Sequence, residues 1–191
     1  MSDAVIPTSL IGLANYYGTD KLEHGYLPWY ETHLGELRDI PFTLLEIGVN
    51  TGASLRTWRD WFVFAEIIGL DIADDLMFTE QRISTYCCDA GDPNALAQLE
   101  LPDDLMVVID DGSHKASDIA VAENVLWPKL SSGGWYVIED LGTQFWPEWE
   151  GGEGGSTVTD ALANTVFYQA IRREGVSEFH AYQQIVFLRK A

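Results

Sequence analysis

The sequence predicts a doubly wound α/β fold: a mostly parallel, seven-stranded sheet that ends in an antiparallel hairpin. Short apolar runs rich in β-formers alternate with helical patterns along residues 43–139. The run LMVVID over residues 105–110 is continuously apolar, as expected for a strand buried on both faces. The last two strand-like runs are separated by almost no residues, whereas a parallel pair needs a crossover of about a dozen or more. They are therefore expected to form a hairpin.

The expected elements follow in chain order. Leu55, Trp58, Phe62 and Ala65 have helical spacing after the first strand, and Pro93 suits the first turn of a short helix. The sequence predicts strands over residues 43–48, 67–71, 83–87, 105–110, 135–139, 178–182 and 184–188. It predicts helices over 53–65, after Asp92, over 116–130 and over 158–173, with a glycine-rich loop over 151–155.

Length and charge limit the possible partners. The chain has 191 residues, which suits one domain, and 11 basic against 30 acidic side chains give a net charge of −19. Such a charge disfavours binding to nucleic acids and to anionic membranes, because both require clusters of Lys and Arg. The sequence contains no apolar run of about 18 residues, and its first residues lack the features of a signal peptide. We therefore expect a cytoplasmic protein.

A glycine-containing loop follows the first expected strand and has the sequence EIGVNTG. Gly48 and Gly52 would let the backbone approach a ligand at the start of a helix. Glu46 would repel a pyrophosphate but suit a cationic amino group. Asp71 ends the second strand, where an acid can accept hydrogen bonds from both ribose hydroxyls. The alternative is an ordinary tight turn with a capping aspartate; we favour a nucleoside site.

Three acids follow two neighbouring strands. Asp111 comes directly after the strand over residues 105–110, and Glu139 and Asp140 lie at the end of the next. The carboxyl ends of such strands meet at one edge of the sheet, so these carboxylates should converge. They need a compensating cation, and oxygen ligands suit Mg²⁺ or Mn²⁺. Alternatively, the acids cap helices or pair with Lys or Arg.

Two further features lie near this edge. His114 follows Asp111 by three residues, where its imidazole could accept a proton, bind the metal as a fourth ligand or cap the next helix. Trp146 and Trp149 could offer flat apolar faces to a sugar or polyketide acceptor.

The first loop, the acid after the second strand and the final hairpin together resemble the class I S-adenosylmethionine (SAM)-dependent methyltransferases. Four segments resemble more closely the metal-dependent sugar O-methyltransferases of macrolide tailoring, of the tylosin and mycinamicin type: TDKLEHGYLPWYE, LLEIGVNTGASLRTWRDWF, VIDDGSH and YVIEDL. The cephalosporin-hydroxylase-like proteins share the metal-site pattern.

This resemblance implies roles for individual residues. His114 would be the catalytic base, and Lys21, His24 and Tyr26 are weaker candidates for the site. The expected metal ligands are Asp111, Glu139 and Asp140. The expected cofactor-binding residues are Glu46, Gly48, Gly52, Ser54, Asp71, Asp89 and Asp111. Residues 1–40 would form an N-terminal helical lid segment of the same domain, and residues 41–191 the SAM-dependent methyltransferase domain.

The implied activity is Mg²⁺-dependent transfer of a methyl group from SAM to a hydroxyl of a sugar, a glycosylated natural product or a polysaccharide. The acceptor would present vicinal oxygens, and a homodimer would let a second chain help to close the site. A catechol-type O-methyltransferase is an alternative. A cephalosporin-hydroxylase-like oxidoreductase is another, but a non-haem iron site usually takes two His and one carboxylate, and here one His accompanies three acids.

Overall fold

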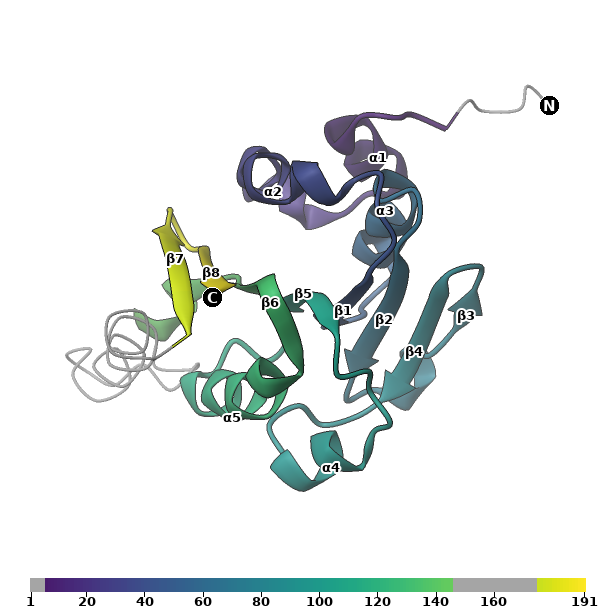
Figure 1. The fold of residues 1–191 in the computed structure, drawn as a ribbon. Coiled ribbons are helices and arrows are strands. Elements are labelled where there is room, and N and C mark those ends of the chain that lie inside the picture. The colour runs from purple at the N-terminus through teal and green to yellow at the C-terminus, as the bar shows by residue number, and fades with distance from the viewer. Residues whose placement is uncertain (1–5, 146–174) are drawn as a thin grey trace.

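The computed structural model describes residues 6–145 and 175–191. They form one sheet of eight strands in the order β3-β4-β2-β1-β5-β6-β8-β7 (Figure 1). The strands are β1 Thr43–Ile47, β2 Glu66–Asp71, β3 Thr79–Glu80, β4 Ile83–Cys87, β5 Leu105–Asp110, β6 Leu130–Ile138, β7 Val176–Ala181 and β8 Val186–Lys190. The central strands β4, β2, β1, β5 and β6 are parallel, whereas β8 is antiparallel to both β6 and β7. The predicted parallel sheet with a terminal hairpin is confirmed.

The sheet has one strand more than the seven predicted. β3 contains two residues and pairs antiparallel with β4 across a turn in which Arg82 has a φ of 60°. Two residues are too few to show an alternating pattern, so the sequence gives no signal for this strand. β6 also begins five residues earlier than expected, at Leu130 instead of residue 135.

The described part of the chain contains five α-helices: α1 Leu10–Tyr17, α2 Leu27–Leu34, α3 Ala53–Trp61, α4 Pro93–Gln98 and α5 Ala116–Leu126. Short 3-10 turns cover Asp20–Leu22, Gly35–Leu37, Asp74–Leu76, Trp127–Lys129 and Leu141–Phe145. The helices predicted over 53–65 and 116–130 are both shorter than expected. α3 ends because Phe62 turns to an extended conformation and packs into the core. α5 gives way to a 3-10 turn at Trp127, because Pro128 has no backbone N–H with which to continue the hydrogen bonds of the α-helix.

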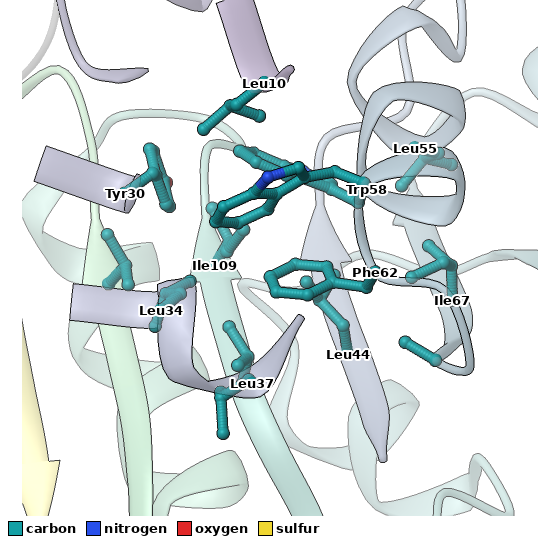
Figure 2. Packing of buried hydrophobic residues seen from close by; sticks show 14 of the residues in the cluster. Leu10, Tyr30, Leu34, Leu37, Leu44, Leu55, Trp58, Phe62, Ile67 and Ile109 are labelled. Carbon is teal, nitrogen blue, oxygen red and sulfur yellow. The ribbon is translucent and has the colours of Figure 1, made fainter. Parts of the chain in front are cut away.

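Two hydrophobic layers cover the sheet, with α1, α2 and α3 on one face and α4 and α5 on the other (Figure 1). Side chains alternate between the faces along each strand: Val107 and Ile109 join the first layer, and Val108 joins the second. In the first layer the Trp58 indole lies between Tyr30 and Leu55 (Figure 2). The expected N-terminal helical segment is therefore packed on the sheet, while its role as a lid stays a prediction.

Several predicted features lie outside the described residues: the helix over 158–173, the glycine-rich loop over 151–155, and both Trp146 and Trp149.

Among the described helices, none combines the length and the apolar character that a membrane crossing requires.

Candidate active site

A cavity of about 610 Å³ opens at the carboxyl ends of the parallel strands. This edge of a doubly wound sheet is where ligands usually bind. The walls come from residues 47–51 and 53–54 from the end of β1 onward, residues 71–72 from the end of β2, residues 88–91 after β4 and residues 110–115 from the end of β5 onward. Residues 18–20 of the N-terminal segment and Asp140 complete the lining that we use below.

The first loop reaches the cavity through its backbone. Gly48 has a φ of 99°, and a Cβ at this position would lie 2.2 Å from the carbonyl oxygen of Asp111. Only glycine fits there, and the loops after β1 and β5 touch because of it. Gly52 also has a positive φ, but it faces Phe78 and Arg56 and does not line the cavity. Its contact with a cofactor therefore stays a prediction.

Asp71 joins two loops of the cavity. Its Oδ2 accepts hydrogen bonds from the backbone nitrogens of Val49 (2.8 Å) and Asn50 (3.3 Å), and its Oδ1 accepts one from Ala73 (3.0 Å). The carboxylate is thus held in a fixed position at the cavity wall, as a ribose-binding acid would require. Asp89 lies farther along the same wall and accepts a hydrogen bond from the nitrogen of Gly91 (2.9 Å).

Three residues form what we call the outer group: Asp111, His114 and Asp140. One ligand atom from each lies within 4.8 Å of the others, and all three line the cavity. His114 and Asp140 both have a positive φ, of 58° and 54°, which is uncommon outside glycine and is often found at functional sites. The Nε2 of His114 lies 3.7 Å from Oδ2 of Asp140. Two carboxylates that are partly exposed to a cavity fit a divalent cation that keeps open positions for other ligands, and the imidazole lies beside them.

Residues from the N-terminal segment hold Asp140 from another side. The hydroxyl of Tyr26 donates a hydrogen bond to its Oδ1 at 2.6 Å, and Nδ1 of His24 lies 3.4 Å from the same oxygen. Both residues were weaker candidates from the sequence, and the structure brings both to the site.

Behind the outer group lies a second set, which we call the inner cluster: Lys21, Tyr30, Glu46 and Glu139. Each of these side chains is buried. The Nζ of Lys21 lies 2.8 Å from both carboxylate oxygens of Glu139 and 3.1 Å from Oε1 of Glu46. It also donates to Oδ2 of Asp111 at 2.7 Å, so Asp111 joins the two sets. The hydroxyl of Tyr30 donates to Glu139.

The structure therefore separates the three expected metal ligands. Asp111 and Asp140 face the cavity with His114, whereas both oxygens of Glu139 contact Lys21. Pairing with a lysine was the alternative that the sequence left open for these acids. Glu46 likewise does not line the cavity: it accepts hydrogen bonds from Ser54 (2.9 Å) and from the Trp58 indole (3.1 Å). The cofactor contact of Glu46 and the metal contact of Glu139 stay predictions.

Burial dominates the electrostatics of the inner cluster. It raises the pKa of the Glu46 carboxyl to about 7, although Lys21 acts in the opposite direction. Burial also raises the pKa of Glu139 well above its usual range. Burial alone would lower the pKa of Lys21, but Asp111, Glu139 and Glu46 outweigh it and keep the lysine charged. Outside the cluster, burial raises the pKa of Asp110 to about 7.

Sequence reasoning missed Tyr30 and underrated Lys21. Glu46 was expected to face a cationic group, and in the structure a lysine of the same chain provides it. The available signal was the segment TDKLEHGYLPWYE, which carries Lys21, Tyr26 and Tyr30 together and contains many groups able to contact acids.

The sequence is similar to those of known O-methyltransferases. No family model matches the sequence. An 8-demethyl-8-α-L-rhamnosyl tetracenomycin-C 2′-O-methyltransferase of Streptomyces olivaceus is 39% identical over 78% of the chain, and demethylmacrocin O-methyltransferase of Streptomyces fradiae is 34% identical over 87%. The chain spans 42% and 49% of these two proteins, or about half of their length.

The fold matches solved methyltransferases as well. The MycE methyltransferase of the mycinamycin biosynthetic pathway, solved in complex with Mg, SAH and mycinamycin VI, superposes with a TM-score of 0.85 at 30% identity, covering 97% of this chain and 55% of that one. A caffeoyl-CoA O-methyltransferase-like protein from Staphylococcus aureus matches with a TM-score of 0.67 at 10% identity, so this similarity concerns the fold alone. By sequence the chain is similar to these O-methyltransferases, and its Rossmann-like fold is similar to that of MycE.

Proposed function

We propose that the chain transfers a methyl group from SAM to a sugar hydroxyl of a glycosylated natural product, with a divalent cation at the outer group. The proposal rests on one observation: the expected nucleoside site and the outer group lie in the same cavity at one sheet edge. A cavity shaped by the first loop and Asp71 continues directly to Asp111, His114 and Asp140. The names of the relatives agree with this class of substrate.

The cavity offers different chemistry at its two ends. Asp71 would accept hydrogen bonds from the ribose hydroxyls of the methyl donor, and the backbone after Gly48 would pass close beside it. Asp111 and Asp140 would hold Mg²⁺ or Mn²⁺, which when bound lowers the pKa of a hydroxyl and orients it. Glu139 would join them as a ligand only by exchanging a contact with Lys21.

His114 would act as the base. Its imidazole is partly exposed, lines the cavity and lies beside Asp140, so it can receive the acceptor's proton as the oxygen takes the methyl group. The sulfonium loses its charge in this transfer. Positioning and exclusion of water therefore contribute much of the rate, together with proton removal.

The first test is calorimetric titration of S-adenosylhomocysteine into the chain, with and without Mg²⁺. Asp71→Ala should weaken nucleoside binding, and Asp111→Ala should remove Mg²⁺ binding. Asp103→Ala is the matched control, because Asp103 is an exposed acid paired with Lys129 away from the cavity. If the unmodified chain binds no nucleoside, the methyltransferase proposal fails.

A second test addresses the acceptor. Rhamnosides and other glycosides with vicinal hydroxyls are offered together with methyl-labelled SAM, and catechols serve as the competing class. Label transfer to glycosides supports the proposal, while transfer to catechols alone overturns the sugar assignment. Homodimer formation and a cytoplasmic location remain predictions.

A further inference from the structure

Lys21 is a buried cation for which the proposed function has no role. Its side chain is 1% exposed, and its ammonium group lies within 3.1 Å of carboxylate oxygens from three different strand ends: Glu46 near the end of β1, Asp111 after β5 and Glu139 after β6. A buried ammonium is costly unless such partners surround it. Because three carboxylates surround this one ammonium group, we expect Lys21 to have a specific role at the site.

The contacts of Lys21 fix two carboxylates from the interior side. It contacts Oδ2 of Asp111 at 2.7 Å, while the Asp111 side chain stays 20% exposed at the cavity. A carboxylate held through one oxygen presents the other in a constant direction. Glu139 is held more firmly, because Lys21 contacts both of its oxygens and the Tyr30 hydroxyl donates to it as well.

Glu139 also determines where Asp140 lies. The backbone nitrogen of Glu139 donates to the carbonyl oxygen of Asp110 at 3.0 Å, and Asp140 follows directly with a positive φ of 54°. A side chain anchored at Glu139 therefore holds the backbone from which Asp140 projects. The two carboxylates of the outer group are thus each connected to Lys21, one directly and one through its neighbour.

We propose that Lys21 is a positioning residue for the cation site: from the interior it holds Asp111 and Glu139 so that the outer group is arranged for a divalent cation. The inference rests on the proposed function insofar as a cation binds there. Lys21 follows residues 18–20, which line the cavity, so the same anchor also holds this part of the cavity wall. Partners behind metal ligands typically change metal affinity by about 10- to 100-fold.

The experiment measures Mn²⁺ binding to the full chain by electron paramagnetic resonance, without cofactor or acceptor. Lys21→Met removes the charge and keeps a side chain of similar length. We expect about 10- to 100-fold weaker Mn²⁺ binding and a broader spectrum of the bound ion, because the ligand positions become heterogeneous. The matched control is Lys129→Met, which removes a lysine that pairs with Asp103 far from the cavity and should leave binding unchanged.

The outcomes separate this inference from the proposed function. If the unmodified chain binds no Mn²⁺, both the cation site and the role of Lys21 are overturned. If it binds Mn²⁺ and Lys21→Met binds equally well or more tightly, only the role of Lys21 is overturned. Circular dichroism checks that the variant is folded. If it is not, Tyr30→Phe removes one donor to Glu139 without changing charge; a several-fold loss of Mn²⁺ affinity supports the inference, and unchanged affinity overturns it.

Discussion

Two neighbouring residues at the end of β6 have opposite environments. Glu139 is 2% exposed and its carboxylate contacts Lys21, whereas the Asp140 side chain is 17% exposed and faces the cavity beside His114. The same contrast separates buried Asp110 from partly exposed Asp111 at the end of β5. Successive residues leave a strand on opposite sides, so a pair of adjacent acids is divided between the interior and the ligand.

This difference shows which acids already have a cation as partner. Carboxylates of the inner cluster contact the buried Lys21 ammonium. Carboxylates of the outer group lie at a cavity, where an added cation can reach them. Proximity to the sheet edge is common to both sets, and the depth of burial distinguishes them.

The largest effect expected concerns the outer group. His114→Ala should lower the rate of methyl transfer by about 10²- to 10⁴-fold, the usual range for loss of a general base. Binding of S-adenosylhomocysteine should change little, because Asp71, the expected ribose contact, lies on a different wall of the cavity from His114. Single-turnover assays with labelled SAM measure the rate. A variant that keeps activity within a few-fold of the unmodified chain would show that the base is another group.

Next in size is a paired comparison of the two sets. Asp140→Asn should weaken Mn²⁺ binding by at least about 100-fold with little change in unfolding free energy. Glu46→Gln should do the reverse: its buried amide donor would face the donors Lys21 and Trp58 and cost about 1–3 kcal/mol of stability, while Mn²⁺ affinity changes less than tenfold. Chemical denaturation and Mn²⁺ titration measure both variants. Equal effects of the two substitutions would contradict the division into inner and outer acids.

A smaller effect is expected at the opposite end of the cavity. Asp71→Asn keeps the shape of the side chain but loses the charge that would accept ribose hydroxyls, so S-adenosylhomocysteine should bind about 10- to 100-fold more weakly. Asp74→Asn, a nearby acid that does not line the cavity, serves as the control. Calorimetry measures the affinity of both variants for S-adenosylhomocysteine. Similar affinities would show that Asp71 does not contact the nucleoside.

A separate effect is a dependence of stability on pH caused by Asp110. The unfolded chain releases this proton near pH 4, whereas burial raises the folded pKa to about 7. The folded state therefore binds more protons between these values, and this contribution to stability, complete below pH 4, is lost as the pH rises to about 7. Asp110→Asn should flatten this part of the profile. Thermal unfolding at several pH values measures it, and an unchanged slope would assign the dependence to other groups.

Sequence patterns predicted most of the sheet and the convergence on the outer group. Apolar runs located the central strands, and the adjacency of β5 and β6 placed Asp111 near Asp140. The inner cluster could not be predicted in this way. Lys21 contacts Asp111 and Glu139 across 90 and 118 residues of sequence, and no local periodicity records such a contact. The two-residue β3 escaped notice because of its length.

Gly48 gives the site a mechanical property. The carbonyl oxygen of Asp111 occupies the space where a side chain at position 48 would begin. The loop that would cradle the methyl donor and the loop that carries Asp111 therefore rest directly on each other, with no side chain between them at position 48. A displacement of either loop is therefore transmitted to the other. A single methyl group at position 48 would push the two loops apart and misalign the methyl donor with its acceptor.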